Sequence, residues 1–98
     1  MLVKANKVNL KVPYCKIVLK IDKKLEYLGT CDEVIKDDDY KYIIKIRDES
    51  FIYILTHELM HCVDFICERF GFKDTEFRAY LIQYLMIKFT KENNKIKE

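Results

Sequence analysis

A change of hydrophobic period near residue 48 constrains the fold of this 98-residue chain more than any other feature. Before residue 48, short segments rich in β-branched residues are separated by turn-forming residues, which is typical of strands. After it, apolar residues recur every three or four positions, as on one face of a helix. Because the chain is long enough for only one core, we predict a single α+β domain. Its sheet half spans residues 1–47, its helical half 48–90 and its frayed tail 91–98.

Three segments of the first half are predicted strands, and a fourth segment is a weaker candidate. They are residues 15–21, 25–31 and 40–47, with residues 8–12 as the weaker candidate. Consecutive aspartates at 37–39 predict the turn before the last strand. Short connections favour antiparallel pairing, so we expect a three- or four-stranded antiparallel sheet.

Two helices are predicted to follow the sheet. Asp48 is the predicted N-cap of the first helix, and Gly71 is its predicted end. Asp74 is the predicted cap of a second helix that runs from residue 75 to about residue 90. One broad face of the first helix is apolar, and the face opposite carries His57, His61, Asp64 and Glu68.

The overall charge and the spread of lysines limit the partners that the sequence suggests. Eighteen basic residues meet sixteen acidic ones, and the lysines are scattered along the chain. A nucleic-acid footprint requires clustered excess charge, so we expect no nucleic-acid partner. No uncharged run approaches the roughly 20 residues of a membrane-spanning helix, and residues 1–12 do not resemble a signal peptide. We therefore expect a cytoplasmic protein with no membrane partner.

The four cysteines, at positions 15, 31, 62 and 67, lack the Cys-x-x-Cys spacing of a zinc or redox motif. Disulfides would suit a secreted protein, but no export signal is visible in the sequence. We therefore predict that the cysteines are small buried apolar side chains.

Residues 57–61 read HELMH and contain the only two histidines of the chain. On a helix, His57 and His61 lie one turn apart on one face, where both imidazoles can bind a single Zn²⁺. Glu58 projects about 100° away, where a carboxylate can take a proton from metal-activated water. A chain of this composition is expected to contain this pattern by chance only about 0.003 times. Two alternatives are an ordinary histidine pair on an amphipathic helix and a site that has lost its activity.

A catalytic zinc takes three protein ligands and a water, so a third ligand is required. From His57 to Asp64 a helix rises about 10.5 Å, which is too far for one ion to bind both. Asp64 is therefore either an acceptor for an imidazole N–H or a solvated acid. Glu76, at the start of the second helix, is the predicted ligand, provided that the first helix ends or bends early or that the helices cross steeply. The alternative role for Glu76 is to complement the dipole of its own helix.

The combination of HELMH with a following glutamate helix resembles the gluzincin branch of the zincin metallopeptidases. It is most similar to the minigluzincins and to short zincin-like proteins encoded by bacteriophages and prophages. The resemblance covers about residues 25–87. In the glutamate helix it is carried by Glu76, Ala79, Tyr80 and Leu81.

The resemblance implies a small zincin-like domain that binds Zn²⁺ through His57, His61 and Glu76. It implies that Glu58 is the general base and acid. Tyr80, one turn after Glu76, either approaches the developing oxyanion or serves the packing of its helix. It also implies that residues 25–31 form the edge strand to which a peptide substrate adds. Larger family members have a second subdomain that shapes the substrate pocket, and we expect none in these 98 residues.

We therefore expect a zinc-dependent metallopeptidase that hydrolyses a peptide or protein substrate. If the chain is phage-encoded, it acts in the cytoplasm of the bacterial host. One alternative is a non-catalytic accessory protein in which the metal site holds the fold and a surface binds a host factor. Another is a zinc-binding regulator that cleaves or clamps one repressor. A Glu58→Gln variant separates a catalytic from a non-catalytic role, because it keeps the metal ligands.

Overall fold

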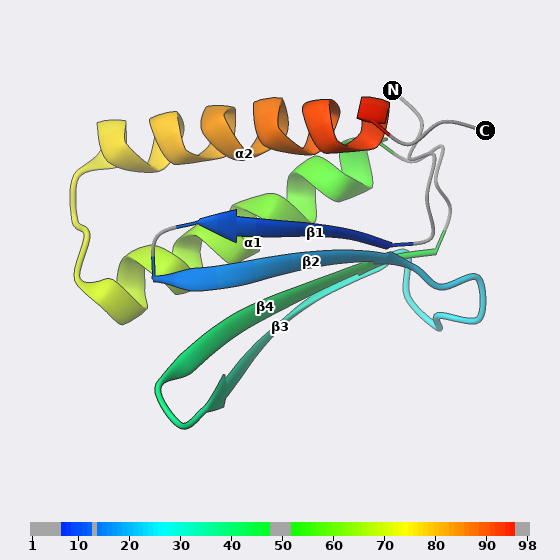
Figure 1. The fold of residues 1–98 in the computed structure, drawn as a ribbon, viewed down its shortest axis with the longest axis horizontal. Coiled ribbons are helices and arrows are strands. Elements are labelled where there is room, and N and C mark those ends of the chain that lie inside the picture. The colour runs from blue at the N-terminus through cyan, green and yellow to red at the C-terminus, as the bar shows by residue number, and fades with distance from the viewer. Residues whose placement is uncertain (1–6, 13, 48–51, 96–98) are drawn as a thin grey trace.

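A computed structural model describes residues 7–12, 14–47 and 52–95 of the chain. The elements in chain order are β1 (Lys7–Val12), β2 (Cys15–Ile21), β3 (Gly29–Lys36), β4 (Asp39–Ile46), α1 (Ile52–Phe70) and α2 (Thr75–Lys95). The strands form one four-stranded mixed sheet, and the two helices follow it in the sequence (Figure 1). The prediction of an α+β fold is confirmed.

The sheet has the strand order β1-β2-β4-β3, and its central pair is parallel. β1 pairs with β2, and β3 pairs with β4, in antiparallel hairpins. The prediction of an antiparallel sheet is therefore wrong for the pair of β2 and β4. Successive strands do reverse direction, but β4 folds back from β3 into the position beside β2. The short connections therefore predict correctly that successive strands run in opposite directions. They do not predict which strands lie side by side in the sheet.

The second predicted strand lies further along the chain than expected. It is predicted at residues 25–31 and is observed at Gly29–Lys36. The chain first makes a turn, in which the Asp22 carbonyl accepts a backbone hydrogen bond of 3.1 Å. The strand then continues to the predicted acidic turn, where Asp37 and Asp38 have φ angles of 50° and 65°. Positive φ at both central residues is what a two-residue hairpin turn requires.

One face of the sheet forms the core with both helices. Side chains alternate between the two faces of a strand, so every second strand residue points toward α1 and α2. Within the described residues, α1 packs against β3 and β4, whereas α2 packs against β1 and α1 (Figure 1). The most deeply buried members of this core are Ile17, Leu19, Tyr42, Ile44, Ile46, Leu55, Leu59, Val63, Leu85 and Phe89. The opposite face of the sheet carries neither helix.

The connection between the helices follows the predicted capping signals. Gly71 has a φ of 76°, and the Phe72 N–H donates a 2.8 Å hydrogen bond to the Cys67 carbonyl. This is the bond that closes a helix with a left-handed glycine. The Asp74 side chain accepts a 2.9 Å hydrogen bond from the Glu76 N–H and caps α2. Both predicted helix boundaries at this connection are confirmed.

α2 is longer than predicted, because its helical turns continue to Lys95. It therefore includes much of the segment predicted as a frayed tail, of which residues 96–98 lie outside the described residues. The predicted N-cap at Asp48 also lies outside them. Neither helix of the described part is both long and apolar enough to cross a membrane.

The cysteines occupy the positions predicted for small apolar side chains. Cys15, Cys62 and Cys67 are buried, Cys31 is half-buried, and all four are free. Burial raises the pKa of the Cys15 thiol to about 11. A buried thiol with a raised pKa is a poor nucleophile, so Cys15 contributes packing rather than chemistry.

Candidate metal centre

The two histidines of HELMH lie on the exposed face of α1. Their rings meet edge to face, and the two Nε2 atoms are 3.2 Å apart. Two imidazole nitrogens bound to one tetrahedral Zn²⁺ are separated by about 3.3 Å, given Zn–N bonds of about 2.0–2.1 Å. In one tautomer the same distance is a hydrogen bond between the rings. The pair is therefore arranged as two ligands of a single ion require.

Glu58 lies on the adjacent face of α1, which packs toward β3. It is 6% exposed and is the buried charged residue of the described core. It forms no hydrogen bond or ion pair with another residue that the structure describes. A buried carboxylate without a partner is costly, so its retention indicates a use other than packing. A surface pocket exposes it beside His57, and this pocket is lined by Leu28, Gly29, Tyr53, Ile54, His57 and Glu58.

Gly29 allows β3 to approach α1 at this point. A Cβ atom at Gly29 would lie 2.7 Å from Cγ2 of Ile54, and 3.0 Å and 3.1 Å from Cγ and Oε2 of Glu58. Gly29 falls within the predicted edge strand, but its contact with α1 was not predicted. The available signal was a glycine within a strand segment, which often marks a close backbone approach. β3 is indeed an edge strand of the sheet.

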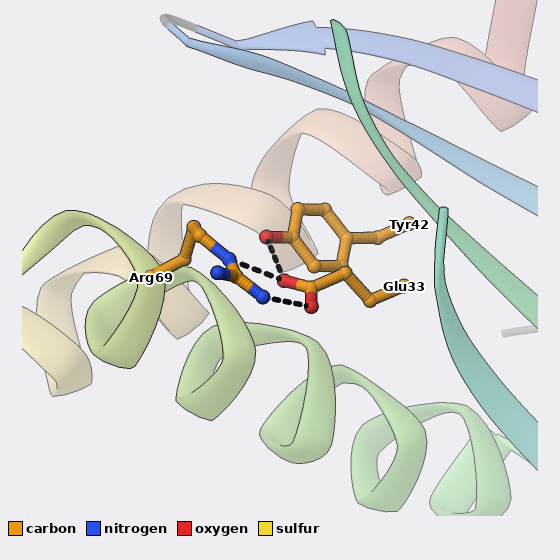
Figure 2. Close-up of polar contacts among 3 residues, drawn as sticks. All are labelled: Glu33, Tyr42 and Arg69. Carbon is orange, nitrogen blue, oxygen red and sulfur yellow. Dashed lines mark hydrogen bonds and ion pairs between the residues drawn. The ribbon is translucent and has the colours of Figure 1, made fainter. Parts of the chain in front are cut away.

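A second contact between β3 and α1 lies beyond HELMH, toward the C-terminal end of the helix. Figure 2 shows the Glu33 carboxylate between the Tyr42 hydroxyl and the Arg69 guanidinium. The Tyr42 hydroxyl donates a 2.8 Å hydrogen bond to Oε2 of Glu33, and Nη2 of Arg69 donates one of 2.8 Å to Oε1. These bonds involve a strand residue, its neighbour on β4 and the last turn of α1. They hold α1 in register with β3 on the far side of the two histidines.

The pKa of Glu33 is lowered in this cluster, and the pKa of Tyr42 is raised. The hydrogen bond from Arg69 holds the pKa of the Glu33 carboxyl below its usual value, and the bond from Tyr42 acts in the same sense. Burial, followed by the hydrogen bond to Glu33, raises the pKa of Tyr42 above its usual value. The folded state therefore favours an ionised Glu33 and a neutral Tyr42.

Among the residues that the structure describes, Asp64 neither accepts a hydrogen bond from a histidine nor stands as a solvated acid without a partner. Its carboxylate accepts a hydrogen bond from the Arg78 guanidinium of α2, and both side chains remain partly exposed. This ion pair joins the turn after His61 to the beginning of α2. Because Glu76 lies two residues before Arg78, it is rotated by about 200° around α2 and points away from α1. Tyr80 is on the same side of α2 as Glu76 and is 65% exposed.

The structure does not bring Glu76 to the histidines. α1 continues without interruption to Phe70, about 13.5 Å of helix rise beyond His61. Neither an early end nor a bend of the first helix is observed. Within the described ranges, no three side chains of His, Cys, Asp or Glu are placed to hold one ion. His57 and His61 thus lie close to one another and Glu58 lines a pocket with His57, whereas the assignment of Glu76 as the third ligand stays a prediction.

Comparisons with known proteins identify no relative. No protein-family model, curated protein sequence or solved structure matches this chain. The interpretation of the site therefore depends on the chemistry of the α1 side chains and on the strand beside them.

Proposed function

We propose that this chain is a zinc-dependent metallopeptidase of the small gluzincin-like type, acting on a peptide or protein substrate. The observation that carries the proposal is the 3.2 Å separation of the His57 and His61 Nε2 atoms beside a buried Glu58 without a described partner. When bound, zinc lowers the pKa of a coordinated water and polarises a peptide carbonyl. The protein supplies the ligands, the proton transfer and the substrate position.

His57 and His61 would hold the ion through their Nε2 atoms, which lie 3.2 Å apart on one face of α1. Glu58 moves the proton. Its carboxylate accepts a proton from the attacking water and delivers it to the leaving amine. The lone pairs of Glu58 are available for this transfer, since no described donor occupies them.

The edge strand β3 is the proposed docking site for the substrate. An extended peptide added to its free edge would gain backbone hydrogen bonds. Gly29 brings β3 against the turn of α1 that contains Glu58. A peptide bound to β3 would therefore pass close to the HELMH turn, and this placement does not depend on the side chains of the peptide.

Glu76 completes the proposed ligand set only if the first turn of α2 rearranges. The ion pair between Asp64 and Arg78 must open in that event, because it holds the opposite side of the same turn against α1. Partly exposed ion pairs contribute only about 0–1 kcal/mol. Opening this one is consequently a small cost beside the binding of a metal.

The alternative function is a non-catalytic zinc-binding accessory or regulatory protein that binds a host factor or a repressor. It is favoured by one observation, namely that only two metal ligands are assembled within the described residues. Two histidines bind zinc more weakly than a complete site, and such an ion would serve structure or partner binding.

Zinc content and peptide hydrolysis test the proposal together. We expect protein purified without chelator to contain zinc and to cleave a quenched-fluorescence peptide library. Glu58→Gln should retain zinc and lose at least about 100-fold in hydrolysis, because the proton acceptor is removed while the ligands stay. The matched control is Glu68→Gln, an exposed carboxylate of the same helix, which should change neither quantity.

Three outcomes separate the possibilities. Equal hydrolysis by the Glu58→Gln and Glu68→Gln variants would show that Glu58 is not the base. Zinc binding without hydrolysis in the unmodified protein would favour the non-catalytic alternative. A Glu76→Gln variant that binds zinc as tightly as the unmodified protein would refute Glu76 as a ligand.

A further inference from the structure

The face of the sheet opposite the helices carries lysines in two rows across three adjacent strands. The register pairs Lys16 with Lys11 on β1 and with Lys41 on β4. It likewise pairs Lys20 with Lys7 and with Lys45. Since neighbouring strands are about 4.8 Å apart, each row places three lysine residues side by side.

An uncharged row separates the two lysine rows. Asn9, Val18 and Ile43 are paired in register and lie between them. Four residues along a strand separate one lysine row from the other, which corresponds to about 13 Å. Val18 is 3% exposed although it lies outside the core cluster that faces the helices. Long lysine side chains can bury such a residue under their aliphatic stems. A surface pocket that reaches this face is lined by Lys7, Asn9, Lys11, Lys16, Val18 and Lys41, together with Leu10 and with Lys88 of α2.

The positive charge of the two lysine rows is only partly offset within the described part of the protein. None of the six lysines forms an ion pair with a residue that the structure describes. The acidic residues of the same face are Asp32 on β3, which pairs with Ile43, and Asp39 on β4, two residues before Lys41. Like charges directly opposite one another in a sheet are destabilising. The rows therefore oppose folding, and an external polyanion would relieve this repulsion.

The composition of the face indicates the kind of polyanion. Protein interfaces are enriched in aromatic residues and depleted in lysine, and single-stranded nucleic acids stack on aromatic side chains. The described outward positions of the three lysine-bearing strands, from Lys7 to Lys11, Lys16 to Lys20 and Lys41 to Lys45, contain no aromatic residue. Lysine binds phosphate as a point charge, and contacts to the phosphate backbone require no base recognition.

We propose that this lysine face binds the phosphate backbone of a double-stranded nucleic acid without sequence preference. A duplex presents phosphates in two tracks along each groove, which matches two charged rows with an uncharged row between them. The expectation of no nucleic-acid partner depended on lysines that are scattered along the chain. Pairing of β1, β2 and β4 gathers these lysines on one surface. This surface lies on the other side of the sheet from α1, so the binding goes beyond the proposed peptidase function and requires no zinc.

Fluorescence anisotropy of a labelled DNA duplex of arbitrary sequence tests the proposal. We expect binding at about 50 mM salt that weakens steeply toward about 200 mM, because phosphate contacts release counterions. Lys16→Gln/Lys41→Gln should weaken binding at least about tenfold and lower the salt slope by about two. The control Lys73→Gln/Lys91→Gln removes the same charge from exposed helix-side positions and should change the affinity far less.

Further measurements make the outcome decisive. Far-UV circular dichroism should show that both variants are folded, and a chelator should leave duplex binding unchanged. Peptide hydrolysis should be unaffected by Lys16→Gln/Lys41→Gln, so failure of the peptidase proposal leaves this one intact. The proposal would be overturned by the absence of duplex binding at low salt, by equal losses in the two double variants, or by tighter binding to a single strand. Binding to phosphatidylserine vesicles in place of the duplex would assign the face to a membrane surface instead.

Discussion

Gly29 and Glu58 form the contact on which the candidate site most depends at the scale of single residues. The strand backbone passes so close to α1 that a Cβ at Gly29 would lie 2.7 Å from the Ile54 side chain. The same atom would approach Glu58 to 3.0 Å. A substitution at this glycine therefore alters packing and the position of the proposed base together.

We predict that Gly29→Ala destabilises the protein by about 1–3 kcal/mol, the usual cost of forcing extra volume into a packed interface. Hydrolysis and zinc binding should fall as well, because β3 and α1 must separate. Gly71→Ala is the matched control. It costs about 1 kcal/mol through its positive φ, but its added Cβ meets no atom within 4 Å. Denaturant unfolding and zinc titration of both variants test this, and a Gly29→Ala variant as stable as the unmodified protein would contradict the contact.

At the scale of elements, α1 is held against β3 by Gly29 on one side of HELMH and by Glu33 on the other. The second attachment depends on ionisation, because Glu33 accepts hydrogen bonds from Tyr42 and Arg69 (Figure 2). Its pKa is lowered in the folded protein, mainly by the bond from Arg69. The stabilisation from Glu33 is thus present above its unfolded pKa of about 4.3 and is lost as the pH falls through the lower folded value.

Tyr42 gives a complementary prediction at alkaline pH. Its pKa is raised in the folded state, so its contribution is complete below the unfolded pKa of about 10 and declines as the pH rises above that value. Tyr42→Phe should remove part of the stability loss above about pH 10, and Glu33→Gln should remove part of the loss below about pH 4.5. Thermal unfolding across these two pH ranges measures both. Parallel pH profiles for the variants and the unmodified protein would contradict the assignment.

The elements differ in how far they could be predicted from the sequence. The acidic hairpin turn, the Gly71 end of α1 and the Asp74 cap were predicted correctly, because each depends on residues that are neighbours in the chain. The parallel pairing of β2 and β4 was missed, since it depends on which strand inserts beside which. Gly29 and the environment of Glu76 likewise depend on the packing of segments distant in sequence.

At the scale of the whole molecule, the topology separates charges that are mixed in the sequence. A net charge of only +2 conceals a sheet face with six lysines in two rows. Each of these lysines is paired with a lysine on a neighbouring strand, and the strand backbones are about 4.8 Å apart, well inside the Debye length of about 10 Å at 0.1 M salt. Sequence order could not reveal this field, because it is created by the register of β1, β2 and β4.

This separation predicts an unusual dependence of stability on salt. Raising sodium chloride from about 20 mM to about 500 mM should raise the melting temperature, because screening weakens the repulsion between lysines. Salt also weakens the ion pairs of Arg69 and Arg78, so the comparison between variants isolates the contribution of the lysine face. Lys16→Gln/Lys41→Gln should melt at a higher temperature than the unmodified protein at low salt and should gain less from added salt. Lys73→Gln/Lys91→Gln should keep the original salt dependence. Identical salt profiles for all three proteins would mean that the paired lysines do not repel one another appreciably, and that the strain attributed to this face does not exist.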